Sequence, residues 1–93
     1  MTFVIYNKGF KMIKRTISKF KNILLRLESD SLSYDDLTRL KIEFELVTVD
    51  FIDELQYLNN DYYKKNKDYL DDLKSGSVLF KVIRKNFRDR NIF

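Results

Sequence analysis

Residues 37–58 read LTRLKIEFELVTVDFIDELQYL, and two periodicities compete within them. Apolar residues alternate with charged ones from Leu40 to Leu46, which suits a half-buried strand. At 100° per residue, however, one narrow apolar stripe keeps its phase from residue 37 to residue 73, which favours a helix. The stripe contains Leu37, Leu40, Phe44, Val47, Phe51, Leu55, Leu58, Tyr62, Tyr69 and Leu73. We predict one helix over about 34–74, roughly 60 Å long at 1.5 Å per residue, straight or bent near Asn59.

A second apolar group lies on the far side of this predicted helix and consists of Ile42, Leu46, Val49 and Ile52. A helical hairpin buries only one stripe of each helix, so this group predicts a further contact. Two occupants suit it. One is the N-terminal segment Phe3–Tyr6, and the other is a second copy of the chain, because short chains often complete their cores by pairing. These four residues are the candidate protein interface, for a homodimer or for a protein partner of unknown identity.

Two shorter helices flank the long one. The first, at about 10–28, separates apolar residues from Lys and Arg on opposite faces. The serine-rich stretch 29–33 reads as a turn with a helix N-cap. Gly76 between two serines reads as a helix stop, followed by a last helix at about 77–90. Because the two flanking helices together match the long one in length, both can pack antiparallel against it, end to end.

The sequence therefore predicts one all-α domain over residues 1–93, a three-helix antiparallel bundle with one long central helix. Ninety-three residues lie near the lower limit for a self-sufficient core. One alternative stays open. In an α+β fold, the apolar start of the chain forms a short N-terminal strand over residues 2–6.

Charge is strongly zoned along the chain. Residues 1–27 carry a net charge of +7, residues 28–72 carry −8 and residues 73–93 carry +5. The basic side chains of the first and last helices form stripes that suit nucleic-acid phosphates or an acidic partner. No helix-turn-helix or RNA-binding signature accompanies them, and the acidic middle helix can neutralise them within the fold. The candidate residues are Lys11, Lys14, Arg15, Lys19, Lys81, Arg84, Lys85 and Arg88.

The residue inventory argues against catalysis. The chain has no Cys and no His, which removes thiolate nucleophiles, the commonest general base and the commonest transition-metal ligands. Asp50 and Glu54 lie four residues apart on the predicted long helix, but such pairs usually mark exposed helix surface. We predict no enzymatic activity, no catalytic or metal-binding residue and no cofactor.

Membrane association is disfavoured as well. No run approaches the roughly 18 apolar residues of a membrane span, and the N-terminus lacks the pattern of a signal peptide, so the expected compartment is the cytoplasm. The first helix resembles a peripheral membrane helix, but its apolar face is needed to cover the long stripe.

We therefore expect a small non-enzymatic binding module that acts through protein–protein interaction, as a regulator, inhibitor or accessory protein. Nucleic-acid binding through the basic stripes is the alternative, and membrane association through the first helix ranks third. The composition, rich in Lys, Asn, Ile, Tyr and Phe, is typical of an AT-rich genome such as that of a phage or mobile element.

Overall fold

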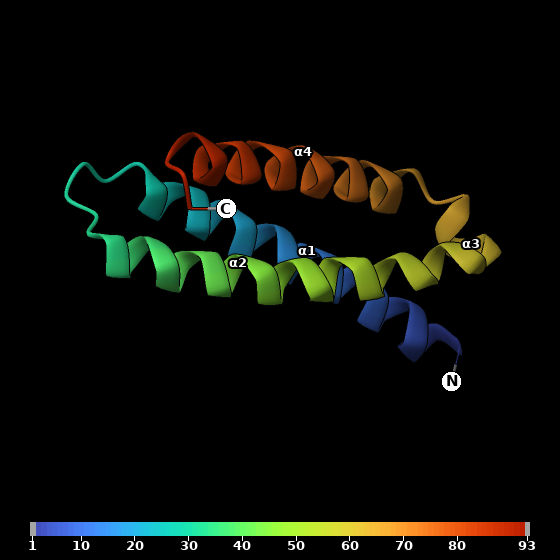
Figure 1. Ribbon diagram of the computed structural model, residues 1–93. Helices are drawn as coiled ribbons and strands as arrows, with labels where there is room; N and C mark the ends of the chain where they lie inside the picture. The colour runs from blue at the N-terminus through green and yellow to red at the C-terminus, as the bar shows by residue number, and fades with distance from the viewer. Residues whose placement is uncertain (1, 93) are drawn as a thin grey trace.

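The computed structural model describes the backbone of residues 2–92 and the side chains of residues 11–92. Helices form nearly all of it, and no strand occurs in this part of the chain (Figure 1). In chain order the elements are α1 (Thr2–Leu27), α2 (Tyr34–Glu54), the 3₁₀ helix η1 (Leu55–Asn59), α3 (Asp61–Lys64) and α4 (Lys67–Asp89). The all-α prediction is confirmed. The α+β alternative is wrong, because residues 2–6 belong to the first turns of α1.

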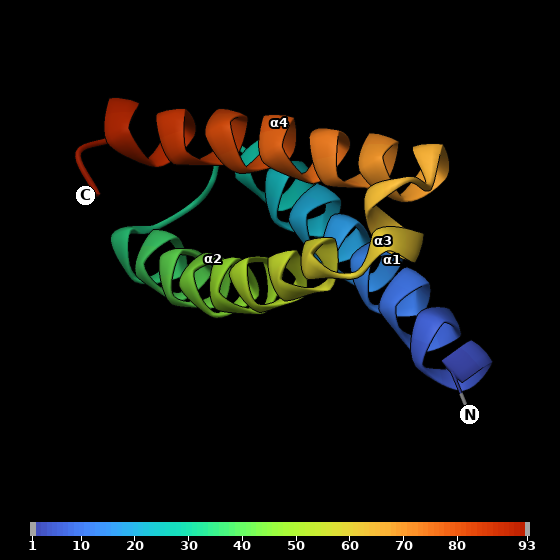
Figure 2. The same cartoon turned by 90° about the vertical axis from the view of Figure 1, so that its right-hand side faces the viewer.

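The three long helices α1, α2 and α4 lie alongside one another, and the chain reverses between successive ones (Figure 1, Figure 2). α1 packs against both of the others, in a molecule that measures 47 × 20 × 18 Å. The predicted placement of the first and last helices end to end is wrong, since α1 and α4 lie side by side. Their C-terminal ends are joined by the Arg90 guanidinium, which donates a hydrogen bond to the Leu27 carbonyl at 2.7 Å.

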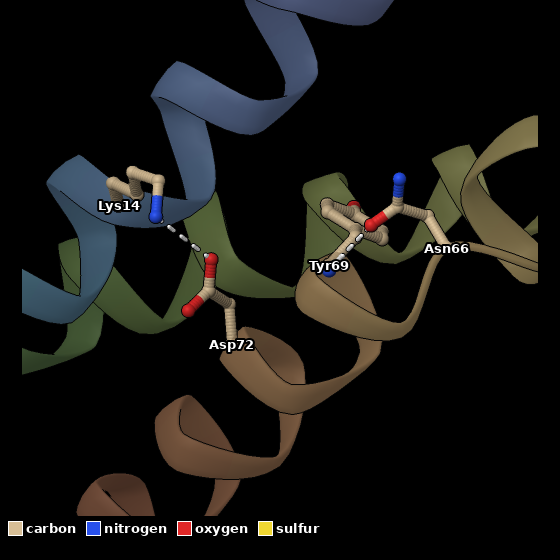
Figure 3. A network of polar contacts seen from close by, with 4 residues as sticks. All are labelled: Lys14, Asn66, Tyr69 and Asp72. Atoms are coloured by element: carbon tan, nitrogen blue, oxygen red, sulfur yellow. Dashed lines mark hydrogen bonds and ion pairs between the residues drawn. The ribbon is translucent and has the colours of Figure 1, made fainter.

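The chain turns back where one continuous helix was predicted, between residues 55 and 66. Two asparagine side chains cap the N-termini of the helices that follow. Asn60 Oδ1 accepts a hydrogen bond from the backbone N–H of Tyr62 at 2.8 Å, and Asn66 Oδ1 accepts one from that of Tyr69 at 3.0 Å (Figure 3). Asn favours this capping role over a helix interior because its side chain competes for backbone donors.

All three predicted helix ranges are corrected accordingly. The helix predicted over 34–74 is α2, the turn and the first part of α4. The helix predicted over 77–90 is the second part of α4, which runs on from before Gly76. The helix predicted over 10–28 begins at Thr2, because Gly9 does not interrupt α1.

Four tyrosines gather where α2 gives way to α4, and we call them the tyrosine cluster: Tyr57, Tyr62, Tyr63 and Tyr69. The Tyr63 ring lies 5.1 Å from Tyr57, 5.7 Å from Tyr62 and 4.8 Å from Tyr69 between ring centroids. The Tyr69 hydroxyl donates to the Glu54 carbonyl at 3.0 Å, which ties the start of α4 to the end of α2. Tyr62, placed on the buried stripe by its spacing, is 47% exposed, and Tyr63 is buried in its stead.

Phenylalanine rings form the centre of the core. Phe20 on α1 contacts Phe44 and Phe51 on α2, with ring centroids 5.9 Å and 5.8 Å apart. Phe44 also stacks on Phe80 at 5.4 Å and lies 5.6 Å from Phe87, both on α4. Phe44 is thus the residue through which all three long helices meet, and aromatic contacts of this kind stabilise beyond the area that they bury.

Gly76 lies inside α4, against the ring of Phe51. A Cβ at this position would lie 2.6 Å from Phe51 Cε1, closer than any side chain can approach. The predicted helix stop is therefore wrong. The glycine is there because α2 and α4 come too close at this point for a side chain.

α2 begins as its sequence predicts. The Ser33 hydroxyl accepts a hydrogen bond from the Asp36 N–H, and the Asp36 carboxylate accepts one from the Ser33 N–H, both at 3.1 Å. These bonds hold the pKa of the Asp36 carboxyl below its usual value. The arrangement is a capping box, which satisfies two otherwise unpaired backbone donors.

We expect Ser33→Ala to lower the free energy of unfolding by about 1 kcal/mol, because it removes the cap of α2. Urea denaturation followed by circular dichroism measures it. Ser31 is the matched control, since its hydroxyl contacts only Ser29 in the same exposed turn. An equal loss from Ser31→Ala would show that the turn as a whole, and not the cap, is responsible.

Candidate protein-binding surface

The four predicted interface residues lie on one exposed face of α2. Ile42, Leu46, Val49 and Ile52 are 54%, 64%, 56% and 57% exposed. Their spacing of four, three and three residues places them together, on the side of the helix away from its buried stripe. The side chains of Phe3–Tyr6, predicted as one possible cover, lie outside the described residues. With more than half of each side chain accessible, the exposed face of α2 is open to a partner.

A groove of about 350 Å³ runs between α2 and α4, beside this face. The stacked rings of Phe44 and Phe80 form its floor, and Val49 belongs both to the groove and to the exposed face. Among the residues that the structure describes, the lining is formed by Phe44, Glu45, Thr48, Val49, Phe80 and Arg84. The sequence pattern identified only Val49 and Arg84, because the groove exists through the packing of α2 on α4.

The predicted basic residues of α4 are brought together. Lys81, Arg84, Lys85 and Arg88 are all exposed, and with Asp89 they line a shallow depression of about 340 Å³. Arg84 also lines the groove between α2 and α4. Two groups of residues that the sequence offered for different partners, the apolar one on α2 and the basic one on α4, therefore adjoin at that groove.

The predicted basic residues of α1 do not join them. Lys11, Lys14, Arg15 and Lys19 are exposed, but none lines the groove or the basic depression of α4. Lys14 forms an ion pair with Asp72 of α4 at 3.3 Å (Figure 3). Part of the basic stripe of α1 is therefore neutralised inside the fold.

Glu54 departs most from its sequence-based interpretation, because it is buried rather than on exposed helix surface. Its side chain is 1% exposed, and Oε2 has no hydrogen-bond partner in the described part of the chain. Burial raises the pKa of the Glu54 carboxyl, and the charge of nearby Asp50 adds to the rise, while Thr16 and Lys19 oppose it. Helical spacing alone indicates that Glu54 is buried, since position 54 follows Phe51 by three residues on the buried stripe of α2.

Thr16 hydrogen-bonds the other oxygen of the Glu54 carboxyl. Its hydroxyl donates to Glu54 Oε1 at 2.8 Å and also lies 3.1 Å from the Met12 carbonyl oxygen. A hydroxyl has one hydrogen to donate, so the two oxygens compete for it. The bond to Glu54 holds the pKa of the carboxyl down, against the larger effect of burial.

Glu54 lacks the surroundings of a catalytic acid. It is sealed between α1 and the end of α2, away from every depression described above. No cluster of potential metal ligands occurs among the described residues.

None of the helices in the described range is long and apolar enough to span a membrane. Comparisons of the chain with protein-family models, with curated proteins and with solved structures find no match.

Proposed function

We propose that this protein is a non-enzymatic helical module that acts by binding other proteins through the exposed face of α2. The exposure of Ile42, Leu46, Val49 and Ile52 carries the proposal. The opposite side of the same helix is closely packed, so the apolar character of the exposed side is not needed for folding. Contiguous apolar surface of this kind marks interaction sites on small proteins.

A second copy of the chain is the partner that this face fits most directly. Arg39 lies before the apolar residues and Asp53 after them, and both are exposed. When two copies of α2 pair antiparallel about a twofold axis, each Arg39 comes near Asp53 of the other copy. Parallel pairing would place like charges together. This one charge pair favours the antiparallel arrangement over the parallel one.

Solution mass measured by light scattering tests this proposal. We expect the wild-type protein to have twice the chain mass of 11.3 kDa in both low and high salt, because the contact is mainly apolar. Leu46→Asp should give a single chain, since it places a charge in the centre of the contact. Asn22→Asp, which adds the same charge to an exposed position of α1, should leave the dimer intact.

Circular dichroism establishes that all three proteins are folded. A wild-type protein that stays monomeric over the accessible concentration range contradicts self-pairing through α2. A Leu46→Asp variant that remains dimeric contradicts it as well, since the dimer would then use another surface.

Nucleic-acid binding is the second candidate function, favoured by the adjacent exposed residues Lys81, Arg84, Lys85 and Arg88. Phosphate contacts require closely spaced basic groups, and they weaken steeply with salt. Addition of a 20-base-pair DNA duplex to the same measurement separates the two functions. A monomer that binds the duplex at low salt, and loses it on Arg84→Glu with Lys85→Glu, would replace the protein-binding proposal.

A further inference from the structure

The groove between α2 and α4 adjoins the exposed face of α2 and shares Val49 with it. Thr48 lines the groove and Leu46 lies at the centre of the exposed face, about 200° apart by helix rotation. Phe80 and Arg84 of α4 line the groove and are not part of the exposed face of α2.

The floor and length of the groove suit a helix. Phe44 and Phe80 supply an apolar floor between two antiparallel helices. From Phe44 to Val49 the groove lining on α2 extends about 7.5 Å at 1.5 Å per residue, which corresponds to between one and two turns of a docked helix. Amphipathic helices bind such grooves through apolar residues at every third or fourth position.

The charges along the groove select the partner. Arg84 lines it from α4, and Lys81, Lys85 and Arg88 continue the basic surface outward from the same helix. Among the lining residues that the structure describes, Arg84 is balanced by Glu45, so the excess of positive charge lies beside the groove, on the α4 side. A partner with carboxylates beside its apolar residues complements this surface, whereas a basic partner is repelled by it.

We propose that the groove between α2 and α4 binds an acidic amphipathic helix of a partner protein, with apolar residues over Phe44 and Phe80 and carboxylates against Arg84 and Lys85. The inference rests on the proposed function, since it gives a protein-binding module a second partner of defined chemistry. It differs from self-pairing in its ligand, in its salt dependence and in its use of α4, while the two surfaces share Val49.

Fluorescence anisotropy with designed peptides tests it on the full chain. The probe is a labelled 18-residue helical peptide with leucines along one side and glutamates beside them. The first control peptide has lysines in place of the glutamates. The second keeps the composition of the probe but spreads its leucines around the helix. We expect only the acidic amphipathic peptide to bind, with a Kd of about 10–100 µM, as befits a small interface.

Two charge-reversed variants of equal net charge locate the binding site. Arg84→Glu with Lys85→Glu should weaken binding of the acidic peptide about tenfold, since two favourable contacts become repulsive. Lys11→Glu with Arg15→Glu makes the same change on α1, away from the groove, and should alter the Kd less than about twofold. All four residues are exposed, so both variants should fold.

Several results would overturn the inference. They are equal binding of the acidic and lysine peptides, no binding at about 1 mM, equal weakening by the two charge-reversed variants, or displacement of the peptide by duplex DNA. The peptide measurement is repeated on Leu46→Asp. If monomeric Leu46→Asp still binds the peptide, the groove is a binding site even where self-pairing fails. If the wild-type protein is a dimer that does not bind the peptide, the proposed function stands and the groove is refuted as a binding site.

Discussion

Gly76→Val should lower the free energy of unfolding by about 3 kcal/mol, a large part of the 5–15 kcal/mol typical of a small domain. Valine at an exposed helix position is normally no worse than glycine. Here its Cβ would lie 2.6 Å from Phe51 Cε1, and its methyl groups would extend further into the same ring. Phe51 cannot retreat freely, because it is 9% exposed and packs edge-on against Phe20.

Urea denaturation of a matched pair measures the effect. Ser75→Val introduces the same side chain at the preceding, exposed position of α4 and should change stability by less than about 0.5 kcal/mol. A double-mutant cycle isolates the contact. Gly76→Val should cost less in a Phe51→Leu background than in the wild type, because the smaller side chain gives it room. An unchanged cost would place the strain elsewhere in α4.

Glu54→Gln should raise the free energy of unfolding at pH 7 by about 2 kcal/mol. A buried polar atom without a partner costs about 1–3 kcal/mol, and more when it is charged. At neutral pH the wild-type protein must either hold a carboxylate at this site or bind a proton there. The neutral amide removes the cost of the charge or of the bound proton, and its oxygen can accept the hydrogen bond that Thr16 donates. One polar group stays unpaired in both proteins, so the gain is that of the charge alone.

The pH dependence has a definite sign. The folded-state pKa of Glu54 is raised, so the wild-type protein loses stability as pH rises from the ordinary value near 4.5 to the raised value, and the loss then levels off. The advantage of Glu54→Gln should therefore be small below about pH 4 and should grow through this window. The lowered pKa of Asp36 has the opposite effect, but it is common to both proteins and cancels in their difference.

Asp53→Asn provides the control, since it makes the same change of charge at the neighbouring, exposed position. It should alter stability by less than about 0.5 kcal/mol, with no added pH dependence between pH 4 and 7. A Glu54→Gln variant that is less stable than the wild type at pH 7 would show that the carboxylate has a partner worth more than the cost of its burial.

Helical periodicity predicted the fold class correctly but missed the reversal. Both α2 and α4 turn their apolar sides toward α1, and across a turn nothing ties the phase of one helix to that of the other. Phase alone thus cannot distinguish one long helix from two that share a core. The signal for the turn was the pair of asparagines at positions 60 and 66, each of which caps a helix. Capping preference outweighs periodicity at such positions.

Gly76 shows a different limit of local reasoning. A glycine between two serines is typical of a helix end. The reason for it lies on another helix, in the ring of Phe51, and no local pattern contains that information. The same holds for Thr16, a polar residue on the apolar side of α1 that contacts Glu54 from α2.

The two groups of residues that form the candidate surface were predicted from the sequence, but their proximity to each other was not. The second apolar group of α2 followed from helical spacing, and all four of its residues are more than half exposed. The basic residues of α4 also followed from spacing. That Val49 and Arg84 line one groove depends on the turn between residues 55 and 66, which folds α4 back along α2. With one long helix, the two would have lain far apart.

The tyrosine cluster also makes one end of the molecule visible to spectroscopy. The chain has six Tyr and no Trp, and four of the six belong to the cluster. Its near-ultraviolet circular dichroism and intrinsic fluorescence therefore report chiefly on the junction between α2 and α4, while the phenylalanine-rich centre contributes little. Burial raises the pKa of the Tyr69 hydroxyl, so this tyrosine should ionise above the ordinary tyrosine range in an alkaline titration. A near-ultraviolet signal that disappears before the far-ultraviolet helix signal would identify local opening at the junction, ahead of global unfolding.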